Sequence, residues 1–242
     1  NRRDIIRETW LKLGAERRFK HYFVIGTLDL VEDQLNNLYD EQKKNDDLLL
    51  FPHLKDTYSA LSLKLLTSFK WFANKIKFNY LLKVDDDSFV QIDKLFDELV
   101  EEKLKTSNAL HWGYFDGRAH VKRRGQWMEK RWILCDRYLP YALGGGYVIS
   151  HDLVTFVSKN SDILQLYANE DVSLGVWLAP LILNRVHDIR FDTEFESRGC
   201  SNNYLITHKQ SIVDMKSLYY NLQSLGRLCE KEVRFKNAYD YN

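Results

Sequence analysis

The sequence predicts an α/β fold with a mostly parallel, Rossmann-like sheet flanked by helices. Through the first half of the 242-residue chain, short apolar runs alternate with longer amphipathic segments. This order is typical of parallel sheets that carry helices on both faces. Only three Pro and eleven Gly occur, and no linker-like or low-complexity segment divides the chain. We therefore expect one domain over residues 1–242.

The first half is expected to alternate between strands and helices. In chain order these are a strand over 21–26, a helix over 32–44, a strand over 47–51, a helix over 57–75, a strand over 80–84 and a helix over 92–104. In the helix over 57–75, apolar residues from Leu61 to Phe72 recur at helical spacing, and Asp56-Thr57 supplies an N-cap. The run 80–84 is apolar enough for a buried strand of a parallel sheet.

The second half is less regular. We expect strands over 109–114, 147–149 and 204–207, and helices from residue 152, over 170–178 and over 212–225. Gly226 should end the last helix. Residues 117–137 are basic, rich in Trp and without periodicity, which favours a surface loop or ribbon over a site.

Composition excludes several classes of partner. Lys and Arg number 35 against 34 Asp and Glu, so no overall field favours nucleic acid or an anionic membrane. The sequence contains no stretch of about 20 apolar residues, so it predicts no membrane span. The three cysteines at 135, 200 and 229 predict one disulfide in an oxidising compartment, with the pairing left open.

The tripeptide Asp85-Asp86-Asp87 follows the strand over 80–84. In an extended chain Asp85 and Asp87 share one face and Asp86 points the other way. Two ionised carboxylates held this close repel each other unless a cation lies between them. Oxygen ligands favour Mg²⁺ or Mn²⁺, and an ion at the carboxyl edge of an α/β sheet is well placed to hold a nucleotide diphosphate. An acidic turn without a ligand is the alternative interpretation.

Several motifs together resemble the β-1,3-glycosyltransferases of the Golgi. In family order they are residues 3–10 (RDIIRETW), 56–58 (DTY), 61–64 (LSLK), 83–89 (KVDDDSF), 138–147 (YLPYALGGGY), 170–172 (EDV) and 207–209 (THK). Within the family, residues 112–118, 139–147, 170–180 and 191–208 resemble the members that transfer galactose to a galactosyl-xylose acceptor on a proteoglycan core protein.

The resemblance implies a single catalytic domain of GT-A type over residues 1–242. It also implies UDP-galactose as donor, a β-1,3 linkage formed with inversion, and a role in building the glycosaminoglycan linker. The expected location is the Golgi lumen, with a membrane anchor upstream of Asn1. The alternatives are a β-1,3-N-acetylglucosaminyltransferase of the same fold and a non-catalytic sugar-binding or chaperone relative.

Inversion by a single displacement requires a base for the acceptor hydroxyl. Asp171 is the expected base. It lies in the first turn of a predicted helix, where the helix dipole favours the carboxylate and should keep its pKa low. Glu170 is the alternative base, or a partner that orients an acceptor hydroxyl. The alternative is that Glu170 and Asp171 are simply the acidic first turn of a helix and have no catalytic role.

Asp87 is the main expected metal ligand, and Asp85 is expected to bind ribose, or the metal through water. His208 is the expected nitrogen ligand, and His187 is the weaker competitor. Because imidazole suits Mn²⁺ better than Mg²⁺, we expect Mn²⁺, with Mg²⁺ as the alternative.

The resemblance places Arg3, Arg7 and Lys64 at the donor site near the uridine, together with the Asp85–Asp87 motif that includes Asp86. A guanidinium can stack on a base or bind phosphate oxygens in a bidentate manner. A solvated helix face is the alternative for these three. Lys83 is expected to pair with an acidic neighbour or the donor, because an unpaired cation is costly beside a buried strand.

Glycine and tryptophan residues complete the expected acceptor site. Gly145 and Gly146, in the run 144–146, would let the backbone approach the sugar closely, and a tight turn is the alternative. Trp112 and Trp127, with Trp132 as a third candidate, offer apolar faces to sugar rings, although at least one is expected in the core.

Overall fold

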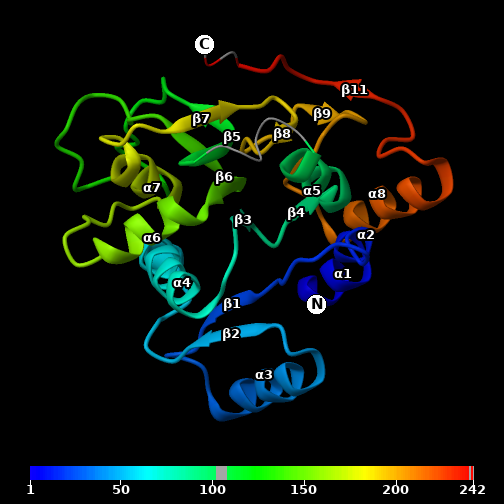
Figure 1. The fold of residues 1–242 in the computed structure, drawn as a ribbon, viewed down its shortest axis with the longest axis horizontal. Helices are drawn as coiled ribbons and strands as arrows, with labels where there is room; N and C mark the ends of the chain where they lie inside the picture. The colour runs from blue at the N-terminus through cyan, green and yellow to red at the C-terminus, as the bar shows by residue number, and fades with distance from the viewer. Residues whose placement is uncertain (102–107, 240, 242) are drawn as a thin grey trace.

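The largest sheet of the computed structural model has four strands in the order β3-β6-β5-β7. They are β3 (Tyr80–Val84), β6 (Tyr141–Ser150), β5 (Leu110–Asp116) and β7 (Asn184–His187). β6 is antiparallel to both β3 and β5, and only β7 is parallel to its neighbour β5. The α/β class is confirmed (Figure 1), but the prediction of a mostly parallel sheet is wrong. The structure describes residues 1–101, 108–239 and 241.

The prediction failed because β3 pairs with a strand that lies far away in the sequence. β1 (Phe23–Gly26) and β2 (Leu48–Phe51), joined by helix α3 (Glu32–Asn45), are parallel as the alternation predicts. The neighbour of β3 is instead β6, which comes more than fifty residues later in the chain and whose direction no local pattern reveals. β3 is therefore an edge strand of its sheet and only partly buried.

Three short strands form a second sheet in the order β4-β10-β8. They are β4 (Ser88–Val90), β10 (Ile206–His208) and β8 (Phe191–Asp192). β10 is antiparallel to β4, with His208 opposite Ser88. This pairing places His208, from the second half of the chain, opposite the residue that directly follows the Asp triplet. A further pair joins β9 (Gly199–Cys200) to β11 (Val233–Arg234).

Helices cover both faces of the central sheet (Figure 1). The remaining ones are α1 (Arg2–Glu8), α2 (Trp10–Leu13), the 3-10 turn η1 (Tyr58–Ala60), α4 (Leu61–Lys75), α5 (Ile92–Glu101), α6 (His151–Lys159), α7 (Glu170–Leu178) and α8 (Ile212–Leu225). Residues 102–104 of the predicted helix over 92–104 lie outside the described residues. Within the described ranges, no helix has the length and apolarity that crossing a membrane requires.

The helix ends follow the local chemistry in α8 but not in α4. Ser211 caps α8 by accepting a hydrogen bond from the Asp214 N–H, and Gly226 ends it with φ 66°, a left-handed conformation that glycine adopts without strain. Of the predicted cap Asp56-Thr57, Thr57 occupies the N-cap position of the 3-10 turn η1, without a side-chain cap hydrogen bond, but Asp56 does not cap. Its carboxylate binds Lys64 instead, and α4 starts after a 3-10 turn at residues 58–60.

Two hydrophobic cores lie on opposite faces of the central sheet, because successive strand residues point to opposite sides. One core packs α4, α6 and α7 on the face that carries Phe115, Tyr147 and Ile149. The other packs α1, α2, α5 and α8, together with the second sheet, against Trp112 and Val148. Both faces of the central sheet are therefore covered, so that a functional site is expected at an edge or at the ends of its strands.

The predicted irregular segment 117–137 is confirmed as a stretch with a single isolated β-bridge, between His120 and Arg137. Its inner side packs through Trp132 against Tyr138, Tyr167 and Val172. Val172 lies in the first turn of α7. The segment is therefore fixed over the start of that helix.

The disulfide left open by the sequence joins Cys200 to Cys229, 29 residues apart, and Cys135 is an exposed free thiol. A cross-link of this loop length restricts the unfolded chain and stabilises the fold by about 3–4 kcal/mol.

We predict that the double variant Cys200→Ser/Cys229→Ser loses about that free energy of unfolding, measured by urea denaturation. Cys135→Ser is the matched control and should unfold like the wild type. Equal stability of all three proteins would contradict the assignment.

Candidate active site

Asp85, Asp87 and His208 converge where the two sheets meet. Each offers a ligand atom, and these atoms lie within 4.8 Å of one another. Nε2 of His208 is 3.2 Å from an oxygen of Asp87 and 3.9 Å from one of Asp85. The two aspartates share a side as expected, although they do so in a turn between β3 and β4 rather than in an extended strand. The predicted ligand set is therefore assembled in space.

His208 is held with one nitrogen facing the carboxylates. Its Nδ1 lies 3.2 Å from the carbonyl oxygen of Glu194, and donation to that oxygen leaves Nε2 turned toward Asp87. Burial lowers the pKa of His208, but the hydrogen bond and charge of Asp87 outweigh it and raise that pKa. Two carboxylates and an imidazole oriented by a backbone carbonyl fit a Mn²⁺ ion.

Lys83 connects this cluster to the start of α7. Its Nζ lies 2.7 Å from Asp85 and 3.0 Å from Glu170, and it also donates to the Gly144 carbonyl. Burial opposes the charge, yet Asp85 and Glu170 hold the pKa of Lys83 well above its usual value. The expected pairing of Lys83 with an acidic neighbour is confirmed with two partners.

Asp171 is enclosed but keeps part of its surface accessible. Its carboxylate accepts hydrogen bonds from the backbone N–H groups of Gly144 (3.1 Å) and Val172 (2.7 Å). Burial, and next the charge of Glu170, raise the pKa of Asp171 to about 7. The low pKa expected from the helix dipole is therefore wrong, because desolvation dominates over the dipole here.

Glu170 behaves differently from its neighbour. Burial raises its pKa, but the charge and hydrogen bond of Lys83 prevail and lower it. The pKa values of the two adjacent carboxyl groups are thus pushed apart. Glu170 is ionised, and Asp171 is able to gain or lose a proton near neutral pH. Such a division suits a general base at Asp171 and an orienting role at Glu170.

The glycine run lies inside strand β6 and forms no tight turn. A Cβ on Gly145 would stand 2.9 Å from Cγ of His208, and one on Gly146 would stand 2.9 Å from Cδ1 of Ile206. These glycines let β10 approach β6. Gly145 makes room for the ring of His208, and the contact of Gly145 and Gly146 with the sugar stays a prediction.

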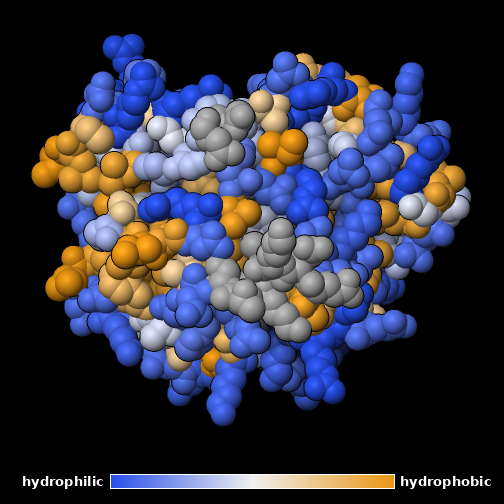
Figure 2. All heavy atoms as spheres, turned by 45° about the horizontal axis from the view of Figure 1, so that its top comes forward, coloured by the Kyte–Doolittle hydropathy of each residue, from blue (hydrophilic) through white to orange (hydrophobic). Residues whose placement is uncertain are grey.

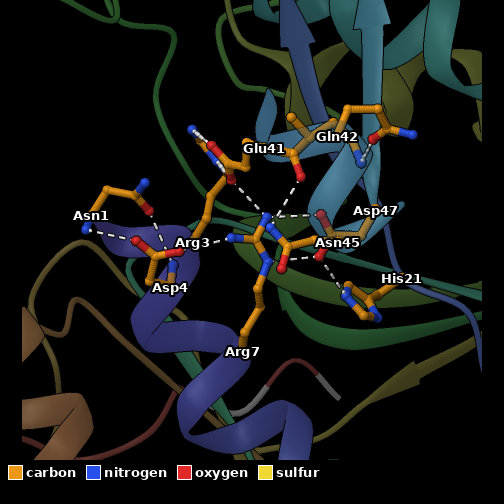
Figure 3. A network of polar contacts seen from close by, with 10 residues as sticks. Asn1, Arg3, Asp4, Arg7, His21, Glu41, Gln42, Asn45 and Asp47 are labelled. Atoms are coloured by element: carbon orange, nitrogen blue, oxygen red, sulfur yellow. Dashed lines mark hydrogen bonds and ion pairs between the residues drawn. The ribbon is translucent and has the colours of Figure 1, made fainter. Parts of the chain in front are cut away.

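Arg3 and Arg7 bind the carboxylates of Glu41 and Asp47 (Figure 3). Nε of Arg3 lies 2.7 Å from Glu41, and Arg7 contacts both Asp47 (2.7 Å) and Glu41 (2.6 Å). The hydrogen bond from Arg3 is the main cause that lowers the pKa of Glu41 to about 2. Their guanidinium groups tie α1 to α3 and to the residue before β2. Arg3 also lines the cleft that contains the Asp triplet, and the donor-binding role of both arginines stays a prediction.

Arg2 is the cation that sequence reasoning missed. Its Nη1 lies 3.8 Å from Asp86 and 3.9 Å from Asp87. The matching motif began one residue later, at Arg3, and no periodicity marks Arg2. Lys64 binds Asp56 at 2.8 Å and lines the same cleft as the Asp triplet, so its donor role stays a prediction.

That cleft has a volume of about 2220 Å³. It extends between β1 and β3 and is lined at its polar end by Lys64, Lys83, Glu170 and residues 85–87. Nucleotide and cofactor sites need roughly 300–1,000 Å³. The cleft therefore has ample room for a nucleotide beside the acidic turn.

The structure excludes the predicted sugar-stacking role of Trp112 and the predicted metal-ligand role of His187. Trp112 is 0% exposed, donates from Nε1 to Asp188 at 3.0 Å and packs on Phe191, so it cannot stack on a sugar. His187 accepts a hydrogen bond from the Phe115 N–H and is not part of the metal cluster. Trp127 is half-buried and stays a candidate for the acceptor site.

Comparisons with known proteins identify the family of the chain. The family described as Galactosyltransferase matches residues 1–188. The chain is 44% identical over 244 residues to beta-1,3-galactosyltransferase 6 of Mus musculus, covering 100% of the chain and 75% of that protein. It is 30% identical over 221 residues to UDP-GalNAc:beta-1,3-N-acetylgalactosaminyltransferase 2 of Xenopus laevis, covering 87% of the chain and 44% of that protein.

Among solved structures, HddC from Yersinia pseudotuberculosis has a TM-score of 0.30 and 10% identity, over 60% of this chain and 63% of that one. That likeness is too low to define the fold. The family match and the mouse relative together confirm the resemblance found in the sequence motifs. The chain belongs to the galactosyltransferase family.

Proposed function

We propose that this protein is a metal-dependent, inverting β-1,3-galactosyltransferase that uses UDP-galactose. The observation that carries the proposal is the joining of two groups by Lys83. One is the Asp85, Asp87 and His208 cluster, and the other is the carboxylate pair at the start of α7. A donor site and a base are thereby adjacent. The mouse relative, 44% identical, is named a beta-1,3-galactosyltransferase.

The donor end is supported by charge. A Mn²⁺ ion, or Mg²⁺ as the alternative, would be held by Asp85, Asp87 and His208 and would offset the charge of a departing diphosphate. Arg2, 3.9 Å from Asp87, adds a fixed positive charge beside this cluster. Lys64 lines the cleft that would receive the rest of the nucleotide.

The acceptor end is supported by Asp171. As the acceptor hydroxyl oxygen bonds to the anomeric carbon of galactose, its proton passes to the Asp171 carboxylate. The bond from that carbon to UDP breaks, and its electron pair leaves with UDP. Glu170, kept ionised by Lys83, is available to accept a hydrogen bond from a second hydroxyl.

The acceptor class and the compartment complete the proposal. We infer a galactosyl-xylose acceptor of a proteoglycan linker, from the same motifs that indicated the family. The Cys200–Cys229 disulfide is expected in an oxidising compartment such as the secretory pathway, which supports a Golgi location. An N-acetylgalactosaminyl donor is the second candidate, because the Xenopus laevis relative carries that name.

A donor panel tests the function. With a galactosyl-xyloside acceptor, we predict a β-1,3-linked product from UDP-galactose and little from UDP-GalNAc or UDP-GlcNAc, measured by mass spectrometry and NMR. Asp171→Asn should lower transfer at least ~100-fold, because the base is lost, while UDP affinity measured by calorimetry stays unchanged. Preference for another donor would overturn the galactose assignment, and substantial turnover in Asp171→Asn would refute the base.

Metal dependence is tested by nucleotide binding. We predict that Asp87→Ala and His208→Ala each weaken Mn²⁺-dependent UDP binding at least ~10-fold in calorimetry, because a ligand to the ion is lost. Asp40→Ala, an exposed carboxylate on α3, is the matched control and should bind like the wild type. Wild-type affinity that is the same with and without a chelator would contradict the metal claim.

The pKa of Asp171 predicts the pH profile. Because only the ionised carboxylate accepts a proton, kcat/KM should fall as pH drops through the raised pKa, well above the value of about 4 for an exposed aspartate. Glu170→Gln removes a charge that raises this pKa. Its acid limb, normalised to its own plateau, should therefore shift to lower pH.

Glu16→Gln, at an exposed position, is the charge-matched control and should leave the limb in place. An acid limb that Glu170→Gln leaves unmoved, or moves to higher pH, would show that Glu170 does not govern the protonation of Asp171.

A further inference from the structure

Hydrophobic side chains are exposed in several places on the face drawn in Figure 2, so exposure alone marks no site. One aromatic pair differs from the others by its position. Trp127 and Phe195 pack edge to face, with ring centroids 5.0 Å apart and an interplanar angle of 79°. They come from segments far apart in the sequence, and each is attached to a different half of the proposed site.

Trp127 is tied to the base side. Its carbonyl oxygen accepts a hydrogen bond from Nδ2 of Asn169 at 3.3 Å. Asn169 is the residue that precedes Glu170 and Asp171 and forms the N-cap position of α7. The other side of the same amide accepts from the hydroxyl of Tyr58 at 3.3 Å. The position of Trp127 is therefore fixed relative to the two carboxylates of α7.

Phe195 is tied to the metal side. It follows Glu194, whose carbonyl oxygen is 3.2 Å from Nδ1 of His208. Lys209, which follows His208, places its Nζ 5.2 Å from the centroid of the Phe195 ring. Despite these contacts Phe195 remains 56% exposed. Its ring is held in place, yet much of its surface faces solvent.

We propose that Trp127 and Phe195 form an aromatic platform for the acceptor, in which a pyranose ring stacks on the face of one aromatic ring and is bordered by the other, roughly perpendicular ring. This inference rests on the proposed function. A β-galactoside presents a face of C–H bonds that packs on aromatic rings, and aromatic side chains supply large apolar contact at fixed geometry. Because the pair links segments that carry the base and the metal ligand, a ring stacked there lies beside both. Its hydroxyl edge is then free to face Asp171.

The test separates acceptor binding from donor chemistry. Initial rates are measured against galactosyl-xyloside at saturating UDP-galactose, and UDP-galactose hydrolysis is measured without acceptor. We expect Phe195→Ala and Trp127→Ala each to raise the acceptor KM about tenfold, the effect of removing one side chain's apolar contact. UDP affinity and donor hydrolysis should be unchanged. Phe195→Trp should restore the KM.

Phe235→Ala is the matched control, because Phe235 is 76% exposed and is absent from this pair. An acceptor KM that stays at the wild-type value in Phe195→Ala overturns the proposal. A parallel loss of donor hydrolysis also overturns it, since the pair would then shape the site rather than bind sugar. If Trp127→Ala fails to fold, the exposed Phe195 decides alone.

A binding titration keeps this inference distinct from the proposed function. Galactosyl-xyloside is titrated calorimetrically into the wild type and Phe195→Ala in the presence of UDP and Mn²⁺. Wild-type binding that is lost in the variant supports the platform even if no galactose is transferred. Transfer by the wild type with equal acceptor affinity in both proteins supports the function and rejects the platform.

Discussion

The site depends on the balance of charge around five carboxylates. Asp85, Asp86 and Asp87 follow β3, and Glu170 and Asp171 begin α7. Carboxylates this close cannot all remain ionised unless cations lie among them. Lys83 stands between the two groups, His208 closes one side and Arg2 the other. Burial raises the pKa of both carboxyl groups at the start of α7, and the pairing with Lys83 decides that the pKa of Glu170 is nevertheless lowered. Glu170 has Lys83 as a direct partner, while among the described residues the hydrogen bonds to the Asp171 carboxylate come from backbone N–H groups.

The fold brings these groups together through β-pairing over long chain distances. β6 lies beside β3 and presents its glycines to β10, so that the ring of His208 reaches the acidic turn. β10 in turn pairs with β4, the strand directly after Asp87. A side chain on Gly145 would push against His208. The position of His208 in the metal cluster therefore depends on the absence of a side chain at Gly145.

Local patterns predicted what local forces decide. Helix α8 was predicted with its end at Gly226, because amphipathic spacing and a left-handed cap are both written in adjacent residues. The parallel pair β1 and β2 was predicted for a similar reason. The antiparallel partner of β3 was not, because it depends on a strand more than fifty residues away.

The same distinction holds for the candidate site. Asp85, Asp87 and His208 were identified by residue type and motif order, and they do converge. The pairing of Arg3 and Arg7 with Glu41 and Asp47 could not be read from the motif, since it requires knowing where α3 and β2 lie. Burial is equally invisible in one sequence. It placed Trp112 in the core and left Phe195, to which the sequence motifs gave no role, exposed.

Anomalous diffraction from crystals grown with UDP and Mn²⁺ would locate the ion directly. We predict a manganese peak within bonding distance of Asp87 and His208, with the diphosphate on its open side. Clear nucleotide density without a peak there, or a peak held by other residues, would contradict this prediction.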